Sequence, residues 1–406
     1  MKVVWLCQYS LQYVSSKLKI NIDPSQIHPA TWLHYLAKEI RNHPNIDLHI
    51  ITPSYYLDKD YEFTEGNVTY HLLKIWYPHL GRKFNYLYSR MTLGFNYPLL
   101  KRKFLKIINE IGPDIINLHG TEHFYGIYLN EIKYPVLVWM QGIINHVIKY
   151  ENSFQFRNKL ENENRVLRHQ KYYITIPSNM EELILKRNSR AKFFHLYYPI
   201  SGNAFELQSE NVQKENDIVY VGSICKRKGI EDLLEATYKI VEKIPQLKVK
   251  VIGHSDANYL ANIKKIISDS KIRNNVNIRG AIPDHDEVLL EVKKSKIFIL
   301  PTYVDSGPRS VAESMAIGTP VISYDLDGLP LMIKNGVSGI LIEKGNINQL
   351  SEAAISLLQD DAKREDISKI AHEYARNNFY APRIVQELIN IYKIIIANSE
   401  KDMNKT

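Results

Sequence analysis

The sequence predicts an α/β protein built from two parallel-sheet halves. Short apolar runs, typical of buried strands, alternate with helical patterns, and this alternation occurs twice along the 406 residues. Such alternation is typical of a parallel sheet with helices on both faces. Residues 207–216 are polar and lack periodicity, which predicts a linker between the halves. Residues 382–397 carry apolar side chains at helical spacing and predict a final amphipathic helix.

The first half, residues 1–208, predicts a Rossmann-like domain. Helices are expected at residues 30–41 and 99–110. The strands are expected at residues 3–7, 48–52, 68–73, 115–119, 136–140 and 172–176. The first of these runs is too short and lacks the basic flank of a signal peptide, so we interpret it as a strand.

The second half, residues 209–381, predicts a second domain of the same kind. Its strands are expected at residues 218–221, 249–252, 276–279, 297–300, 321–324 and 340–342. The apolar stripe that begins at Ile230 predicts a helix after the first of them.

Composition excludes several other classes of protein. A hydrophobic fraction of 45% and a charged fraction of 24% are ordinary for a globular chain. Cys7 and Cys225 are too few for a disulfide framework or a zinc cluster, and they fit a reducing cytoplasm. No run of 18 apolar residues occurs, so the sequence predicts no membrane span.

The net charge of +8 is unevenly distributed, because residues 66–109 contain no acid. Basic side chains alternate there with aromatic ones. The basic residues of this basic-aromatic segment are Lys74, Arg82, Lys83, Arg90, Lys101, Arg102, Lys103 and Lys106. Two interpretations stay open: peripheral contact with an anionic membrane, or a solvated basic face over a packed aromatic core. Nucleic acid is not expected as a partner.

The most informative stretch is residues 298–323, whose pattern is strand, loop, short helix and strand. Asp305 lies in the loop and Glu313 lies eight positions later in the helix. Pro308 suits the first helical turn, and Gly318 followed by Pro320 ends the helix. Free N–H groups at a helix start attract phosphate, while two carboxylates can accept from hydroxyls. This combination predicts a nucleotide-sugar site at the carboxyl ends of the strands.

These residues resemble the signature of the retaining family-4 glycosyltransferases, in which Glu-x7-Glu precedes a helix and Gly-Thr-Pro-Val. Here Asp305 replaces the first Glu. The loop that resembles a variant found in this family consists of Ser306, Gly307, Pro308, Arg309 and Ser310. The resemblance implies the GT-B fold: two Rossmann-like domains that face each other across a cleft, with the C-terminal helix, about residues 382–398, crossing back to the first domain. A βαβ unit whose Asp caps a helix and whose Glu is solvated is the alternative.

The loop after the first strand of the second half also resembles that family. Gly222, Lys228 and Gly229 match its Gly-Arg-Leu-x-x-x-Lys-Gly pattern, while Ser223 replaces the Arg. The resemblance places Lys228 on the leaving diphosphate. Arg227 or Arg309 could supply the missing cation. The alternative for Lys228 is a solvated lysine before a helix.

The resemblance assigns further roles at the donor side. Glu313 would accept hydrogen bonds from the ribose hydroxyls, and Asp305 would contact hydroxyls of the transferred sugar. The amides of residues 306–310 would hold the diphosphate. Residues 280–283, with Ile282, match the base-binding loop, although a simple strand-to-helix turn is equally compatible. Leu331 replaces a Glu that relatives carry.

The acceptor side is expected in the first half. We expect His28 to line it before the first helix, while His119 ends a strand and Gln141 follows the next strand. Many relatives carry a His near the position of Gln141. Because Gln cannot carry a proton, this substitution argues against a protein base there.

The sequence therefore predicts a metal-independent retaining glycosyltransferase without a cofactor. It would move a hexosyl unit from a nucleotide sugar to a glycan or lipid-linked glycan in bacterial surface polysaccharide or lipopolysaccharide synthesis. We expect it in the cytoplasm, at the inner face of the plasma membrane. Two alternatives remain: a nucleotide-sugar epimerase of the same shape, or a degenerate non-catalytic sugar-nucleotide-binding protein. The departures that favour the latter are Ser223, Asp305, Gln141 and Leu331.

Overall fold

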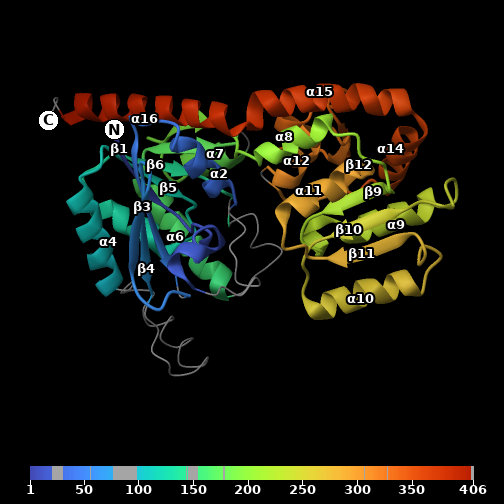
Figure 1. Ribbon diagram of the computed structural model, residues 1–406, viewed down its shortest axis with the longest axis horizontal. Helices are drawn as coiled ribbons and strands as arrows, with labels where there is room; N and C mark the ends of the chain where they lie inside the picture. Colours follow the sequence, from blue (N-terminus) through green and yellow to red (C-terminus); the bar gives the residue numbers. More distant parts are fainter. Residues whose placement is uncertain are drawn as a thin grey trace. The chain divides into compact units, whose positions relative to one another are not determined.

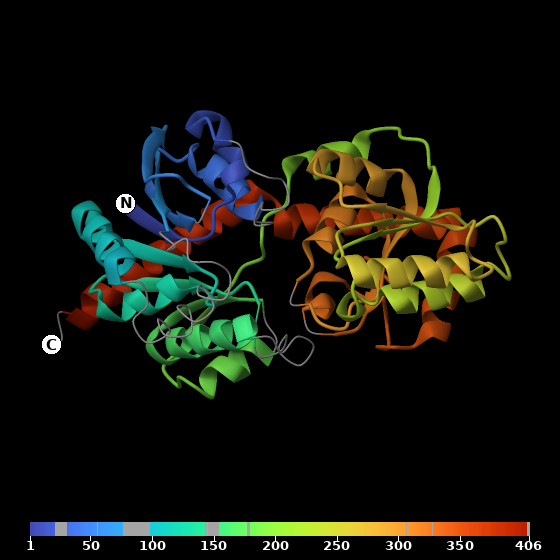
Figure 2. The ribbon, with the colours of Figure 1, turned by 90° about the horizontal axis from the view of Figure 1, so that it is seen from below.

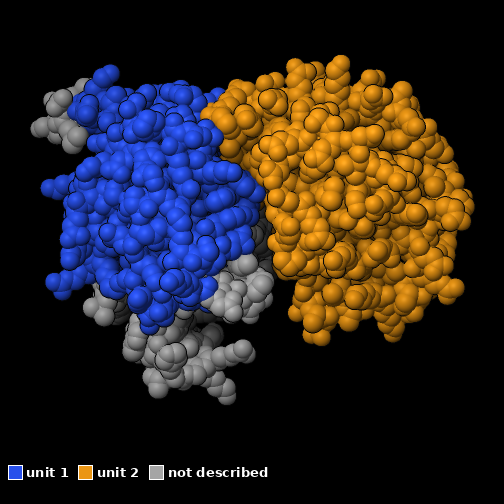
Figure 3. Space-filling view, viewed as in Figure 1, with its two compact units in different colours: residues 1–196, 384–406 blue, residues 197–383 orange. Residues whose placement is uncertain are grey.

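The computed structural model describes two compact units (Figure 3). The first comprises residues 1–196 and 384–406, and the second comprises residues 197–383. The described residues are 1–20, 31–54, 56–75, 98–142, 144, 154–176, 179–305, 307–326 and 328–403. Within them, no helix is long and apolar enough to cross a membrane.

The first unit contains an eight-stranded sheet in the order β3-β4-β2-β1-β5-β6-β7-β8. Its strands are β1 (Lys2–Leu6), β2 (Asp47–Ser54), β3 (Tyr61–Glu65), β4 (Val68–Lys74), β5 (Ile115–His119), β6 (Val136–Trp139), β7 (Tyr172–Thr175) and β8 (Lys192–His195). All neighbours pair in parallel except β3 and β4. The edge strand β3, which the sequence pattern missed, is antiparallel because only two residues join it to β4, and Gly66 turns the chain there at φ +61°.

Helices of the first unit include both that were predicted. The described helices are α1 (Ser15–Leu18), α2 (Thr31–Ile40), α4 (Pro98–Ile111), α6 (Phe154–His169) and α7 (Asn179–Leu185), with 3-10 turns at Leu11–Tyr13 and Phe124–Glu131. The final helix, α16 (Ala381–Met403), also packs on this unit, beside β1 (Figures 1 and 2).

A buried polar contact fixes α16 to the sheet. Trp5 Nε1 donates to the Tyr392 hydroxyl at 3.0 Å, and that hydroxyl donates to Asn117 Oδ1 at 2.6 Å. The three side chains come from β1, α16 and β5, hundreds of positions apart. The predicted return of the last helix to the first half is therefore confirmed.

The second unit contains a six-stranded, all-parallel sheet in the order β11-β10-β9-β12-β13-β14. Its strands are β9 (Asn216–Val221), β10 (Val249–Ile252), β11 (Val276–Gly280), β12 (Ser295–Leu300), β13 (Val321–Tyr324) and β14 (Ile340–Ile342). Every strand predicted for this half is present. The order reverses between β9 and β12, so that β10 and β13 lie on opposite sides of this central pair.

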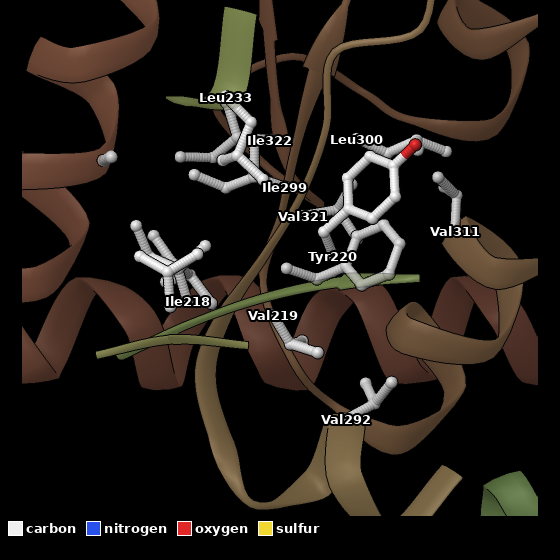
Figure 4. Packing of buried hydrophobic residues seen from close by; sticks show 14 of the residues in the cluster. Ile218, Val219, Tyr220, Leu233, Val292, Ile299, Leu300, Val311, Val321 and Ile322 are labelled. Atoms are coloured by element: carbon white, nitrogen blue, oxygen red, sulfur yellow. The ribbon is translucent and has the colours of Figure 1, made fainter. Parts of the chain in front are cut away.

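Helices cover both faces of this sheet (Figure 1). They are α8 (Gly202–Glu206), α9 (Ile230–Ile240), α10 (Ala257–Ser268), α11 (His285–Lys293), α12 (Arg309–Ile317), α13 (Leu329–Met332), α14 (Ile347–Gln359) and α15 (Asp361–Phe379). Helix α9 packs against α14, while α12 packs against α11 and α15. The core between strands and helices is aliphatic, with Tyr220 as a large buried ring among Leu300, Val311 and Val321 (Figure 4).

The boundary between the units differs from the predicted one. We expected residues 197–208 in the first domain, but they belong to the second unit. The reason is apolar packing: Ile200, Ala204 and Phe205 are buried in the core of that unit. The polar stretch begins with a short 3-10 turn, Leu207–Ser209, and continues without regular structure to β9.

Candidate functional site

The predicted donor residues gather where the strand order of the second unit reverses. Lys228 lies in the loop beyond β9, and Asp305 lies in the loop beyond β12. These two strands are neighbours, and their parallel pairing brings their carboxyl ends to the same edge of the sheet. In open parallel sheets, ligands bind at such a reversal point. Two segments far apart in sequence therefore meet at one position suited to a ligand.

The loop beyond β9 is closely packed against the loop beyond β12. Tyr303 N donates to the carbonyl of Arg227 at 2.8 Å. Gly229 follows a 3-10 turn, Lys226–Lys228, at φ +71°, and a Cβ there would lie 1.8 Å from the carbonyl oxygen of Pro301. Only glycine fits this close approach and backbone angle. The packing fixes Lys228, the residue before it, over the end of β12.

Lys228 and Asp305 form an ion pair through Nζ and Oδ2. Each side chain is 15% exposed. The other oxygen of Asp305, Oδ1, accepts from Gly307 N at 3.3 Å. Lys228 is thus held in the site, and the alternative of a solvated lysine is wrong for this structure.

Helix α12 begins after Pro308, which occupies the N-cap position, one residue before the predicted first turn. No side chain caps this helix start. Asp305 therefore does not cap the helix, contrary to the alternative interpretation of the module. Gly318 ends the helix at φ +79°, as the sequence predicts.

Glu313 lies inside α12 and is buried, with a side chain 6% exposed. Two side chains from different helices contact its Oε1: Arg309 Nη2 at 2.8 Å and His285 Nε2 at 3.0 Å. The solvated Glu of the alternative interpretation is therefore wrong. Arg309, which we considered for phosphate binding, contacts this carboxylate through Nη2.

The electrostatics keep Glu313 ionised. Burial by itself raises the pKa of this carboxyl, but the charges of His285 and Arg309 outweigh burial, so its pKa is lowered. In return, the Glu313 carboxylate raises the pKa of His285 despite the partial burial of the ring. The site thus contains a buried carboxylate that can accept hydrogen bonds.

The other predicted donor residues that the structure describes also follow strands of the second sheet at their carboxyl ends. Gly222 and Ser223 are half-buried, and the Ser223 carbonyl accepts from the Tyr220 hydroxyl at 2.8 Å. Ile282 is half-buried in the turn between β11 and α11. Ser310 is half-buried in the first turn of α12. Ser306 lies outside the described residues.

The predicted acceptor residues belong to the first unit. His119 ends β5 and is 1% exposed, between Trp5, at 4.9 Å, and Trp139, at 5.5 Å between ring centroids. Burial lowers the pKa of His119 to about 3, so the ring is neutral. This placement in the core gives no support to contact with an acceptor. Gln141 is half-buried beyond β6, and His28 lies outside the described residues.

Sequence reasoning missed His285, which begins α11 after the N-cap Asp284. Its contact with Glu313 spans 28 positions. A lone His at a helix start carries no periodic or motif signal. Sequence reasoning also missed Asp232, which accepts hydrogen bonds from the hydroxyl of Tyr303, at 2.6 Å, and from the hydroxyl of Tyr324.

With this geometry established, comparison with known proteins identifies the class. The fold is GT-B, since solved structures of that class match nearly the whole chain. Sucrose-phosphate synthase from Thermosynechococcus elongatus matches with a TM-score of 0.73 and 17% identity over 98% of this chain and 100% of its own. Anabaena HepE in complex with UDP matches with a TM-score of 0.68 and 15% identity over 97% and 100%.

Sequence comparison then gives a family match for part of the second unit. Residues 204–374 match the model described as Glycosyl transferases group 1, so the chain carries a domain of that family. Poly(glycerol-phosphate) alpha-glucosyltransferase of Bacillus subtilis is 30% identical over 40% of this chain and 24% of its own length. Capsular polysaccharide biosynthesis glycosyltransferase CapM of Staphylococcus aureus is 25% identical over 50% and 53%. The matched part thus spans about a quarter of the first relative and about half of the second.

Proposed function

We propose that the protein is a retaining glycosyltransferase that moves a hexosyl unit from a nucleotide sugar to a hydroxyl group. The observation that carries this proposal is the ion pair of Lys228 and Asp305 beyond the carboxyl ends of β9 and β12, at the reversal point of the second sheet, with the buried Glu313 on the helix that follows β12. These residues offer a cation for a diphosphate and two carboxylates for hydroxyls, in the loops beyond β9 and β12 and in the helix that follows β12. That set matches the parts of a nucleotide sugar.

In the proposed complex, Glu313 accepts from the ribose hydroxyls and Asp305 accepts from hydroxyls of the sugar. Lys228 and the free N–H groups at the start of α12 hold the diphosphate. The bond between the anomeric carbon and the diphosphate oxygen breaks, and a bond from that carbon to the acceptor oxygen forms. The acceptor proton passes to an oxygen of the departing diphosphate. Preorganised positive charge stabilises the leaving group, so we propose that the reaction needs no metal ion.

The acceptor is proposed to be a glycan or lipid-linked glycan of the bacterial surface. The names of the two curated relatives, a poly(glycerol-phosphate) glucosyltransferase and a capsular polysaccharide enzyme, support this class. Lipopolysaccharide belongs to the same class. We propose a location in the cytoplasm, with the first unit, residues 1–196 and 384–406, binding the acceptor near the inner face of the plasma membrane.

The test begins with a thermal-shift panel of UDP-glucose, UDP-N-acetylglucosamine, UDP-galactose and GDP-mannose. A ligand that binds only the native state stabilises it by about 2.7 kcal/mol at a hundred times its Kd. The donor that raises Tm is then incubated with EDTA, with and without glycerol-phosphate polymer or lipid-linked glycan. Transfer with retained anomeric configuration supports the proposal. Conversion of the sugar without acceptor would instead identify an epimerase, and binding without any turnover a non-catalytic protein.

A further inference from the structure

The two oxygens of the Glu313 carboxylate have different surroundings. Oε1 receives both donors, Arg309 Nη2 at 2.8 Å and His285 Nε2 at 3.0 Å. Within the described part of the chain, no hydrogen bond or ion pair involves Oε2. An ionised carboxylate has about four acceptor sites, so Oε2 keeps its capacity to accept.

The two donors come from different helices and hold the carboxylate from two directions. Arg309 stands one turn before Glu313 on α12, at the i,i+4 spacing. His285 begins α11, which packs against α12. Arg309 alone would leave the carboxylate free to rotate, because a single contact fixes a distance but not an orientation. The second donor, on another helix, restricts that rotation and fixes Oε1 as the oxygen that receives both donors.

We propose that His285 is a positioning residue for nucleotide binding: with Arg309 it holds Glu313 through Oε1, so that Oε2 is presented to the ribose hydroxyls. This inference rests on the proposed function, in which Glu313 binds the ribose. His285 itself does not contact the ligand. It acts by removing in advance the orientational freedom that binding would otherwise have to restrict.

A structural role for His285, limited to joining α11 to α12, makes a different prediction. It would change stability, but it would not distinguish a nucleotide with both ribose hydroxyls from one that lacks a hydroxyl. Coupling between His285 and a ribose hydroxyl is therefore the decisive measurement. The measurement is a double-mutant cycle in which one change is made in the protein, at His285, and the other in the ligand, by removal of a ribose hydroxyl.

The experiment measures Kd by calorimetry for UDP, GDP and ADP and for their 2′-deoxy and 3′-deoxy counterparts. Wild type should bind the diphosphate of its preferred base roughly tenfold or more tightly than a deoxy counterpart, the effect of one hydrogen bond to a charged group. His285→Leu should bind the parent nucleotide about as weakly as wild type binds the deoxy form. His285→Gln keeps a donor at a similar reach and should restore the preference.

Two further variants keep the outcome decisive. Glu287→Gln changes an exposed residue of the same helix, paired at 3.7 Å with Arg279, and should leave every Kd unchanged. His285→Asn, whose shorter polar side chain withdraws the donor, replaces the Leu variant if that does not fold. An unchanged ribose preference in a folded Leu or Asn variant overturns the role of His285 alone. Failure of wild type to bind any of the diphosphates overturns the proposed function as well.

Discussion

Lys228 and Asp305, 77 positions apart, form an ion pair at the reversal point of the second sheet. The pair joins a cation expected to bind phosphate to a carboxylate expected to bind sugar. A diphosphate near Lys228 would compete with Asp305 for the ammonium group. Donor binding would therefore release the carboxylate to accept from hydroxyl groups.

Asp305→Asn should lower turnover strongly while it leaves the affinity for free nucleoside diphosphate unchanged or slightly higher. The amide no longer pairs with Lys228, so the ammonium stays available to phosphate. Calorimetry with the diphosphate and a transfer assay with the nucleotide sugar separate the two effects. Asp305→Glu, which keeps the charge, is the matched control. Equal losses for both ligands would mean that Asp305 acts on the nucleotide.

Glu313→Gln should weaken the binding of both the free nucleoside diphosphate and the nucleotide sugar. Loss of a charge-assisted hydrogen bond costs about 1.5–3 kcal/mol, because the carboxylate is the stronger acceptor. Glu287→Gln on α11 is the control for an exposed change of the same kind. If a folded Glu313→Gln variant binds the nucleotide as tightly as wild type does, Glu313 does not bind the ribose hydroxyls.

The ion pair between His285 and Glu313 should make the stability of the second unit depend on pH at both ends. Because the pKa of His285 is raised in the folded protein, this residue contributes its full stabilisation below pH 6.5, the ordinary pKa of His. That stabilisation is lost as pH rises through the raised pKa. Because the pKa of Glu313 is lowered in the folded protein, this residue contributes its full stabilisation above pH 4.5, the ordinary pKa of Glu. That stabilisation is lost as pH falls through the lowered pKa. Urea midpoints across this range measure both limbs. In His285→Gln, the alkaline limb should disappear; an identical profile for variant and wild type contradicts the assignment.

The sequence predicted the strands of both sheets except β3 and β8, because buried parallel strands are short apolar runs, whereas these two edge strands are only partly buried. It also predicted the module from β12 to β13, in which Asp305 and Glu313 are close in sequence. It could not predict the contact between His285 and Glu313, which depends on how α11 packs against α12. For the same reason the burial of His119 was missed, since Trp5 and Trp139 come from neighbouring strands. The local sequence pattern thus predicts which helices and strands form, whereas side-chain contacts between distant helices and strands depend on tertiary packing.

Tyr392→Phe should destabilise the first unit, because its hydroxyl links Trp5 to Asn117 in the core. The change leaves the buried Trp5 N–H and the buried Asn117 side-chain oxygen without this partner. Each such group lowers the free energy of unfolding by about 1–3 kcal/mol. Urea denaturation followed by tryptophan fluorescence measures the loss. Ile394→Ala on the same helix removes a side chain that is 48% exposed and should change little. Equal stability of wild type and the Phe variant would contradict the packing of α16 on this unit.

Ion pairs in the structure reduce the positive charge on which the predicted membrane contact of the basic-aromatic segment depends. Residues 76–97 of that segment lie outside the described residues, but its end forms α4. There Lys101 pairs with Glu131, and Lys103 Nζ lies 2.6 Å from Asp60 Oδ2. Acids from elsewhere in the chain thus offset part of the positive charge that the sequence concentrates here.

If the segment still binds an anionic leaflet, replacing Lys101, Arg102 and Lys103 together by Gln should reduce sedimentation with phosphatidylserine vesicles. Each basic side chain near the surface contributes about 1 kcal/mol, and salt screens this attraction. Activity on a short acceptor without a lipid should remain, since the donor residues belong to the other unit.

The matched control for this charge change replaces three exposed basic residues of the second unit by Gln: Lys264, Lys265 and Arg273. It removes the same net charge, so an effect of total charge alone would weaken sedimentation equally in both triple variants. A local site in α4 predicts a loss only in the first. If wild type does not sediment with the vesicles even at low salt, the ion pairs of α4 have neutralised the segment and the membrane contact is wrong. The proposed donor site would be unaffected by that result, because the residues that we assign to it belong to the second unit.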